Sequence, residues 1–388
     1  MEVKYPLASN TWDAAEERAV TEVLASKRFT MGEYVLKYEK AFAEKFDVKY
    51  AVMSNSGSSA NLLAVAALCY SGRLQPGDEV IVPAVSWSTT YFPLAQYGLS
   101  LRFADIDINT LNIDISALKL AVTDKTKAVV AVNLLGNPCD FDSIQKFCEK
   151  QNLILLEDNC ESMGAEYGGK KAGAFGVLGT FSSFYSHHIC TMEGGVTITD
   201  DEDLYHHMLC IRAHGWTRQL PQSSTLHKKS ENTFYEMFNF IMPGYNLRPL
   251  EMEAAIGLEQ LKKLDNFVNI RRENAEYFCS IFKGNENIII QKETGKSSWF
   301  GFSLILKGKL KGRRDETVKI LQSNGIETRP IVAGNFTKQN ALKFMDYSIA
   351  GNLANADNLH DNGFFVGNNS APIKEQIDYF AKILNELN

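Results

Sequence analysis

The sequence predicts an α/β protein with a mostly parallel sheet in a large domain and a smaller α+β C-terminal domain. Between residues 49 and 200, short β-branched runs return roughly every 25 residues, and helical stretches separate them. After residue 250 the pattern changes to long helical segments followed by strand-like runs. The 388 residues are enough for two structural lobes. We expect a large domain over residues 1–250, with a helical N-terminal segment, and a small domain over residues 251–388.

The strands expected in the large domain share an apolar, β-branched composition. They are Tyr50–Met53, Glu79–Val82, Leu101–Ala104, Ala128–Leu135, Leu153–Leu156 and Thr180–Phe184. Helices are expected between them, at Ala60–Tyr70, Thr89–Tyr97 and Phe141–Gln151. Continuous apolar runs are typical of strands that helices cover on both faces. In such sheets, functional residues gather beyond the carboxyl ends of the strands.

The small domain is expected to begin with helices and then to add strands. Apolar residues recur at helical spacing over Leu250–Leu264, and a long helix continues through Arg271–Phe282. Two strand-like runs follow, at Ile288–Ile290 and Phe300–Leu306, before a helix near Glu316–Asn324. This order of elements predicts an α+β lobe.

Composition excludes several classes of function. The net charge is −6 and no arginine-rich run occurs, so we expect no nucleic-acid partner. The longest apolar stretches reach about half of the roughly 20 residues that cross a bilayer, which argues against a membrane protein. Met1–Asn10 lacks a charged leader followed by an apolar core. We therefore expect a cytoplasmic location.

The seven cysteines are scattered along the chain, and no Cys-x-x-Cys pair occurs among them. This spacing gives no support to a disulfide scaffold, a zinc site or an iron–sulfur cluster. We interpret them as buried free thiols and expect no bound metal.

Three features stand at the predicted strand ends. Asp158 ends the apolar strand before it, where a carboxylate could pair with a protonated pyridine nitrogen and keep that ring an electron sink. Gly57 and Ser58 lie in a strand–turn–helix setting that suits phosphate binding by backbone N–H groups. Trp87 could stack on a flat ring. Taken alone, each is also typical of a helix cap, a glycine-rich turn or a core tryptophan.

The segment from Gly179 to His188, followed by Glu-Gly-Gly at residues 193–195, is more specific. It resembles the DegT/DnrJ/EryC1 family of sugar aminotransferases, whose motif is Phe-Ser-Phe-x-x-x-Lys with Glu-Gly-Gly beginning six residues after the lysine. Phe181 and Ser182 match the start of the motif, and Ser183 replaces its second phenylalanine. Without gaps, the lysine position falls on His187.

The resemblance covers nearly the whole chain and implies the aspartate aminotransferase fold, that of the type I PLP-dependent transferases. It implies pyridoxal 5′-phosphate (PLP) and pyridoxamine 5′-phosphate as coenzyme, with Ser182 on the phosphate and Glu161 on the hydroxyl side of the ring. Asn246 matches an asparagine that reaches the coenzyme phosphate of the neighbouring subunit. A homodimer with shared active sites is therefore expected.

The histidine at position 187 changes the expected chemistry. Histidine cannot form the covalent link that the lysine makes with the coenzyme, but its pKa of about 6.5 suits proton transfer. Within the family, this departure resembles the members that remove the C3 hydroxyl of GDP-linked 4-keto-6-deoxymannose in colitose formation for O-antigen of lipopolysaccharide. The implied reaction consumes glutamate, which regenerates the amine form of the coenzyme, and releases ammonia.

Several alternatives stay open at this point. His188 is the base if the loop is one residue out of register, while Lys170 and Lys171 are interpreted as solvated hairpin residues. His214, Arg218 and Arg248 are candidates for the sugar diphosphate or the glutamate carboxylate, or else form surface salt bridges.

Two rival functions also remain, a 4-aminotransferase that works without the lysine and an inactive nucleotide-sugar binding protein. A related class of 3-dehydrases depends on an iron–sulfur cluster, for which the cysteine spacing offers no site. The nucleotide base, the sugar configuration and any assembly beyond a dimer are not determined by these residues.

Overall fold

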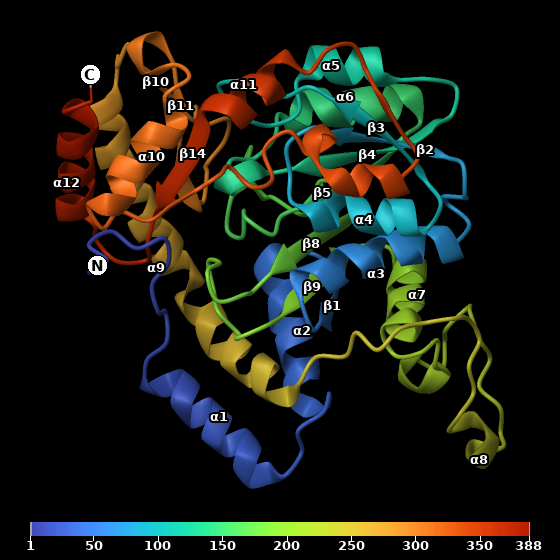
Figure 1. The fold of residues 1–388 in the computed structure, drawn as a ribbon. Helices are drawn as coiled ribbons and strands as arrows, with labels where there is room; N and C mark the ends of the chain where they lie inside the picture. Colours follow the sequence, from blue (N-terminus) through green and yellow to red (C-terminus); the bar gives the residue numbers. More distant parts are fainter. Residues whose placement is uncertain (1, 388) are drawn as a thin grey trace.

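The computed structural model describes residues 2–387. It contains two main sheets, and separate sets of helices pack against each of them (Figure 1). The larger sheet has eight strands in the order β1-β9-β8-β5-β4-β2-β3-β13, and the smaller has four in the order β10-β11-β14-β12. Five neighbouring pairs of the large sheet are parallel, and the two pairs made by β9 are antiparallel. The predicted α/β class with a mostly parallel large sheet is confirmed.

The large sheet alternates with helices along most of the chain, as the spacing predicted. Its strands are β1 (Tyr50–Ser54), β2 (Glu79–Pro83), β3 (Ser100–Ala104), β4 (Thr126–Val132), β5 (Ile154–Asp158), β8 (Leu178–Ser182), β9 (Gly195–Thr199) and β13 (Tyr347–Ile349). The helices of this part are α1 (Ala14–Ser26), α2 (Glu33–Phe46), α3 (Gly57–Tyr70), α4 (Ser88–Gln96), α5 (Ile115–Ala121), α6 (Phe141–Gln151), α7 (Glu202–Arg212) and α8 (Thr233–Glu236). Central strands such as β2 and β8 are buried along their whole length, in keeping with helices on both faces.

The small sheet packs on helices from the end of the chain. It consists of β10 (Ile288–Ile290), β11 (Gly301–Leu306), β12 (Thr328–Arg329) and β14 (Gly363–Gly367), and all of its pairs are antiparallel. The helices here are α9 (Glu251–Phe282), α10 (Arg314–Ser323), α11 (Ala354–Asn362) and α12 (Lys374–Asn385). Phenylalanines from α9, β11 and α12 meet in one buried cluster, which forms part of the core of this lobe.

Both termini lie on the small lobe (Figure 1). Tyr5 is fully buried there, and its hydroxyl donates to the carbonyl of Gly367 at 2.7 Å. The backbone N–H of Tyr5 donates to Gly325, and its carbonyl accepts from Glu327. The first residues of the chain thus pack against some of the last.

Three local predictions differ from the structure. The fourth strand ends at Val132 and not at Leu135, because Leu135 adopts a left-handed backbone with φ of 52° inside a short 3-10 turn. The strand β9 was not predicted. The two helical segments predicted after residue 250 form one uninterrupted helix, α9.

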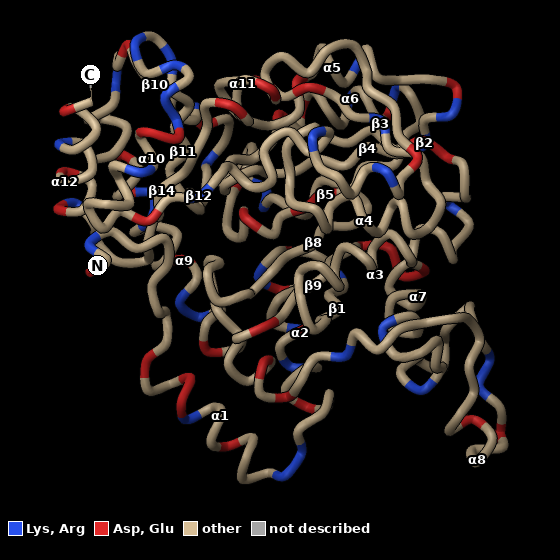
Figure 2. Tube along the Cα trace, viewed as in Figure 1, with Lys and Arg blue, Asp and Glu red and all other residues tan. Residues whose placement is uncertain are grey.

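The division into domains at residue 250 stays a prediction. Helix α9 contributes its first half to the cluster under β1 and β9 and its second half to the small-lobe cluster. Strand β13, from the C-terminal part, pairs with β3 at the edge of the large sheet. Basic and acidic residues are spread over both lobes (Figure 2). Among the helices of residues 2–387, none combines the length and apolar character needed to span a bilayer.

Candidate active site

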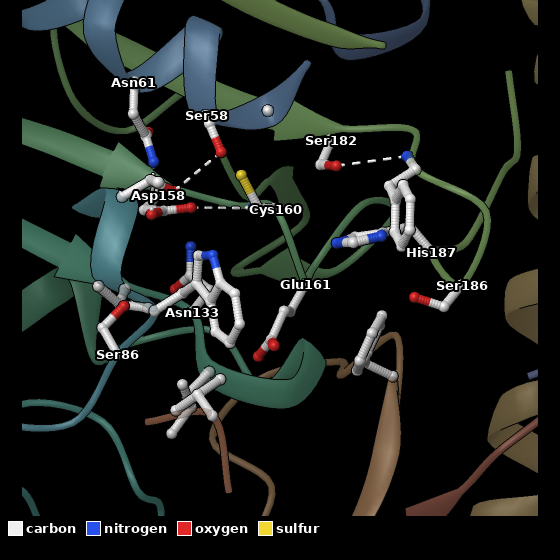
Figure 3. Close-up of a pocket in the computed structure, with 18 of the residues that line it drawn as sticks. Ser58, Asn61, Ser86, Asn133, Asp158, Cys160, Glu161, Ser182, Ser186 and His187 are labelled. Atoms are coloured by element: carbon white, nitrogen blue, oxygen red, sulfur yellow. Dashed lines mark hydrogen bonds between the residues drawn. The ribbon is translucent and has the colours of Figure 1, made fainter. Parts of the chain in front are cut away.

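A cavity of about 440 Å³ opens at the carboxyl ends of β4, β5 and β8 (Figure 3). The large sheet supplies one wall, which includes Asp158 and Ser182 at the ends of their strands. The small lobe supplies another, which includes Phe300, Arg329 and Phe365. Its volume lies within the range of small-molecule sites. It lies beyond the carboxyl ends of the strands, where the sequence predicted functional residues.

An anion-binding cradle forms one end of the cavity. Helix α3 begins at Gly57, and the Ser56 hydroxyl caps it by accepting from the N–H of Ser59 at 3.0 Å. A Cβ atom on Gly57 would lie 2.5 Å from the Cβ of Ser182, so only glycine fits. Ser56, Gly57 and Ser58 all line the cavity, so the free N–H groups of the first helical turn face it. This arrangement suits a phosphate group.

Asp158 is held firmly at the base of the cavity. Its Oδ2 accepts from Asn61 Nδ2 at 3.0 Å and from Thr90 Oγ1 at 2.7 Å, and its Oδ1 accepts from the N–H of Cys160 at 3.1 Å. The side chain is 7% exposed, and what exposure it has is toward the cavity. Two helices and the loop after β5 supply these three donors, which fix the direction of the carboxylate before any ligand arrives.

Glu161 lies beside Asp158 and extends into the same space (Figure 3). Its Oε2 accepts from the N–H of Leu135 at 3.1 Å, which the left-handed backbone of Leu135 presents to it. Burial raises the pKa of the Glu161 carboxyl to about 7, and the negative charge of Asp158 adds to the effect. Near neutral pH this carboxyl can therefore either donate or accept a proton.

His187 faces the cavity from the side opposite Asp158 (Figure 3). Its Nδ1 is buried and has no hydrogen-bond partner within residues 2–387, and its ring packs against Phe300 at 5.3 Å between centroids. Burial lowers the pKa of His187 to about 4, and the buried guanidinium of Arg271 acts in the same direction. At neutral pH the ring is uncharged and can accept a proton.

His188 points away from the cavity. It is fully buried, and its Nε2 lies 3.1 Å from the carbonyl oxygen of Ser298. His188 is absent from the cavity lining, whereas His187 is part of it. The register that the motif spacing gave thus agrees with the side chain that faces the cavity.

The loop that carries His187 is anchored at its far end. The N–H of Cys190 donates to Gln260 Oε1 at 3.0 Å, and the Cys190 carbonyl accepts from Trp12 Nε1 at 2.9 Å. Ser183 and Thr191 face each other across the loop with their hydroxyl oxygens 2.5 Å apart. The serine that departs from the family motif therefore has a definite role in closing the loop.

No lysine lines this cavity among the described residues. Lys170 and Lys171 form the strand β7 (Lys170–Lys171) of a small hairpin, opposite β6 (Glu166–Tyr167). The Lys171 amine donates to Glu166 at 2.6 Å, and Lys170 is exposed. The structure thus agrees with the interpretation of both as hairpin residues.

Four predicted site residues lie outside the cavity of this chain. They belong to one excursion, residues 214–248, which we call the arm and which carries α8 away from the body of the molecule (Figure 1). His214 and Arg218 are exposed, with the Arg218 guanidinium 5.0 Å above the Trp216 ring. Asn246 is exposed as well, and its Oδ1 accepts from Arg248 Nε at 3.0 Å. Their functional roles stay predictions.

Trp87 lines the cavity and is 58% exposed, which leaves one ring face free for a ligand. Other lining residues were not predicted: Ser86, Asn133, Glu193, Phe300 and Arg329. Position after a strand could have indicated Asn133, which directly follows β4. No local pattern indicates Arg329, because it belongs to a two-residue strand in the other lobe. Within residues 2–387, no group of three or more histidines, cysteines or carboxylates is placed to hold a metal ion.

Comparison with known proteins places these features in context. A sequence profile of the DegT/DnrJ/EryC1/StrS aminotransferase family matches residues 10–385. The GDP-4-keto-6-deoxy-D-mannose 3-dehydratase of Escherichia coli is 58% identical over 386 residues, which cover 98% of this chain and 100% of that protein.

Solved structures show the same likeness. The Escherichia coli GDP-4-keto-6-deoxy-D-mannose-3-dehydratase with bound hydrated PLP matches with a TM-score of 0.97 at 58% identity, over 99% of this chain and 100% of that one. GDP-4-keto-6-deoxymannose-3-dehydratase with a trapped PLP-glutamate geminal diamine gives a TM-score of 0.96 at 58% identity, over 98% and 100%. The predicted fold is confirmed.

Proposed function

The chain belongs to the DegT/DnrJ/EryC1/StrS aminotransferase family, and on that premise we propose that it removes the C3 hydroxyl of a GDP-linked 4-keto-6-deoxy sugar. The substrate is GDP-4-keto-6-deoxy-D-mannose, and the 3-deoxy product serves colitose formation for O-antigen. Glutamate is the reductant and leaves as 2-oxoglutarate, while ammonia is released. The observation that carries this proposal is a cavity that, among residues 2–387, presents a histidine and no lysine to the phosphate cradle.

The residues at the strand ends fit the phosphate and ring of vitamin B6 coenzymes. The first turn of α3 and Ser182 hold the phosphate, in a cradle that a Cβ on Gly57 would fill. Asp158 would pair with the ring nitrogen, because its three hydrogen-bond donors hold the carboxylate at the base of the cavity. Trp87 covers a ring face, and Glu161 approaches the ring's hydroxyl side.

When bound, the coenzyme supplies an amine for the C4 ketone of the sugar and a ring that accepts electrons. His187 takes the proton from the C4′ carbon of the coenzyme, since its uncharged ring faces the cavity. His187 then returns a proton to the C3 hydroxyl, which leaves as water. The apolar rings of Phe300 and Phe365 exclude solvent from this part of the cavity.

Proton transfer is also needed in the other half of the cycle. Glutamate would give its amino group to the aldehyde form of the coenzyme; the aldehyde oxygen would leave as water, and the ketone oxygen of 2-oxoglutarate would come from water. His187 moves the proton from the α-carbon of glutamate to the C4′ carbon of the coenzyme. Over the whole cycle, glutamate is oxidised by two electrons and C3 of the sugar is reduced by two.

The proposal is tested by incubating the protein with coenzyme, glutamate and a panel of GDP-, CDP- and dTDP-linked 4-keto-6-deoxy sugars. Mass spectrometry should find a product that has lost one oxygen atom, with equal amounts of ammonia and 2-oxoglutarate. An amino sugar as product would identify a 4-aminotransferase instead. Binding of the sugars without any turnover would identify a nucleotide-sugar binding protein.

We further propose a homodimer in which Asn246 completes the site of the neighbouring chain. Two observations support it. The arm exposes a group of aromatic side chains, with Phe234 80% and Phe238 69% accessible to solvent. Asn246, His214 and Arg218 do not line the cavity of their own chain, although the resemblance assigns Asn246 to a coenzyme phosphate.

A further inference from the structure

Two arginines of residues 2–387 are buried, and they differ in their partners. Arg212 pairs with the carboxylate of Glu39. Arg271 of α9 is 4% exposed, and within the described residues it donates to carbonyl oxygens and to no carboxylate. Burial lowers the pKa of Arg271 to about 10, so its guanidinium still carries its charge at neutral pH. A buried charge without an opposite charge is costly, which indicates a role beyond packing.

Arg271 binds the backbone segment that carries Phe300. Its Nη1 donates to the carbonyl oxygens of Phe300 at 3.1 Å and of Asn368, and lies 3.4 Å from that of Trp299. Asn368 Nδ2 donates to the same Trp299 carbonyl at 2.9 Å. Trp299 has a left-handed backbone with φ of 48°, which bulky residues rarely adopt. These bonds therefore hold a turn that the residue itself does not favour.

The large lobe binds the same segment from its other side. The N–H of Phe300 donates to the Leu135 carbonyl at 3.0 Å, and the N–H of Ser298 donates to the Gly136 carbonyl at 2.9 Å. A Cβ atom on Gly136 would lie 2.5 Å from the backbone nitrogen of Trp299, so the two segments approach as closely as glycine allows. Bonds from both lobes thus fix the position of Phe300.

The ring of Phe300 reaches His187. The two ring centroids are 5.3 Å apart, and Phe184 lies on another side of the His187 ring at 6.0 Å. Within residues 2–387 the structure gives the His187 ring no hydrogen bond, and its buried Nδ1 has no partner. The contacts with these two phenylalanines therefore orient the ring that faces the cavity.

Three sources of charge surround His187. His188 follows it in the chain, α9 contributes Arg271 and Arg272, and the cavity lining contributes Asp158, Glu161, Glu193 and Arg329. The positive charge of Arg271 lowers the pKa of His187, in the same direction as burial. A base must be uncharged before it can accept a proton, so this charge favours the form that the reaction needs.

We propose that Arg271 is a positioning residue for His187, because it fixes Phe300 against the His187 ring and places a buried positive charge nearby. This inference rests on the proposed function, in which His187 accepts a proton. Arg271 does not line the cavity, so it acts through Phe300 and through its charge. The bonds to the backbone affect the rate of proton transfer. The charge affects the pH at which His187 becomes protonated.

Two substitutions of Arg271 separate these effects. Arg271→Lys keeps the charge on a chain one bond shorter, so both half-reactions should slow about 10-fold near neutral pH, with the same fall toward acid pH as in wild type. Arg271→Met also removes the charge. Its rates should fall about 10- to 100-fold, and the fall toward acid pH should begin at a higher pH, because the pKa of His187 rises. Stopped-flow absorbance of each half-reaction against pH measures both effects.

Arg272→Met is the matched control. Arg272 is the next residue of α9, and its guanidinium also donates to three carbonyl oxygens, those of Ser297, Gly164 and Lys296. Arg272 neither bonds Phe300 nor lines the cavity. This variant should lose stability, measured by thermal melting, and keep the wild-type rates and pH profile.

A measurement without substrate makes the test independent of the proposed function. In coenzyme-free protein with isotope-labelled histidines, the NMR signals of the His187 ring are identified by their loss in His187→Asn. Their titration should give a higher pKa in Arg271→Met than in wild type, Arg271→Lys or Arg272→Met. If that shift occurs but no nucleotide sugar is converted, the proposed function is wrong and the effect of Arg271 on His187 stands.

A double-mutant cycle decides the matter if Arg271→Met does not fold. Arg271→Lys should slow Phe300→Leu less than it slows wild type, because both changes act on the same contact with His187. Additive losses in this cycle, wild-type rates in Arg271→Lys, or an unchanged His187 pKa in folded Arg271→Met would each overturn the proposal. The same changes of rate and pH profile in Arg272→Met would overturn it too.

Discussion

The cavity wall and the arm differ in how completely one chain builds them. At the wall, Asp158 is held by three donors, and Ser182, Gly57 and His187 meet around one space. In the arm, Arg218 and Asn246 are exposed and meet only their own neighbours. Strand ends converge because a parallel sheet forces them to, whereas an excursion on the surface has no such constraint. One chain therefore builds the wall completely, whereas the proposed homodimer assigns the arm to the site of a second chain.

The largest expected effect is on the rate of proton transfer by His187, which faces the cavity. His187→Asn keeps a polar side chain but removes the ability to accept a proton, so both half-reactions should slow by about 10²–10⁴. Stopped-flow absorbance of each half-reaction measures this. Coenzyme binding should be retained, because the cradle and Asp158 are untouched.

His188→Asn is the matched control for that variant. His188 bonds the Ser298 carbonyl away from the cavity, so its loss should lower stability more than the rate of chemistry. A normal rate in His187→Asn together with a dead His188→Asn would place the base one residue later.

Gly57→Ala tests the anion-binding cradle of the cavity wall. The added methyl group would overlap Ser182, at a strain of about 1–3 kcal/mol, so coenzyme affinity should fall about 10- to 100-fold. Equilibrium titration followed by fluorescence measures it. Gly32→Ala, just before α2, would place its methyl group 3.2 Å from the Glu251 carboxylate, outside the cavity, and should leave that affinity unchanged. Unaltered affinity in Gly57→Ala would mean that the phosphate lies elsewhere.

The arm is tested by mixing two inactive variants. If Asn246 serves the neighbouring chain, Asn246→Ala and His187→Asn subunits, after dissociation and reassociation, should regain about a quarter of the wild-type sites. Each variant alone is the control. Activity of a verified monomer, or no recovery in a verified hybrid, would contradict the shared site.

The smallest expected effect is the pH dependence of stability that Glu161 of the cavity wall contributes. The pKa of Glu161 is raised to about 7, so its folded form holds a proton that the unfolded form releases near pH 4.5. That contribution to stability is complete below pH 4.5 and is lost as pH rises toward 7. Coenzyme-free Glu161→Gln should therefore gain stability relative to wild type between pH 5 and pH 8, on the order of 1 kcal/mol.

Calorimetric melting at the two pH values measures that difference. The exposed Glu149→Gln should show none. A Glu161→Gln difference that stays constant with pH would mean that the carboxyl titrates normally.

The sequence predicted the wall better than its surroundings for a physical reason. The alternation of strands and helices is a local sequence pattern, and it predicted the positions of Asp158 and Ser182 at strand ends. The spacing of one motif predicted His187. Strand β13 has three residues and pairs with β3 almost 250 residues earlier, so no local pattern marks it. Arg329 was missed for the same reason. Leu135 was assigned to a strand because it lies in a mostly apolar run, and that composition gives no sign of the backbone turn at this residue.

The burial of Tyr5 bears on the order in which this protein becomes folded. A ribosome releases the N-terminus first, yet Tyr5 donates to Gly367 and its backbone pairs beside Gly325, which emerge only near the end of synthesis. Until then the ring of Tyr5 lacks its native contacts and can bind chaperones or form non-native contacts. The wall of the large sheet, except for its edge strand β13, can form well before that. The native contacts of Tyr5 can thus form only after almost the whole chain has been made.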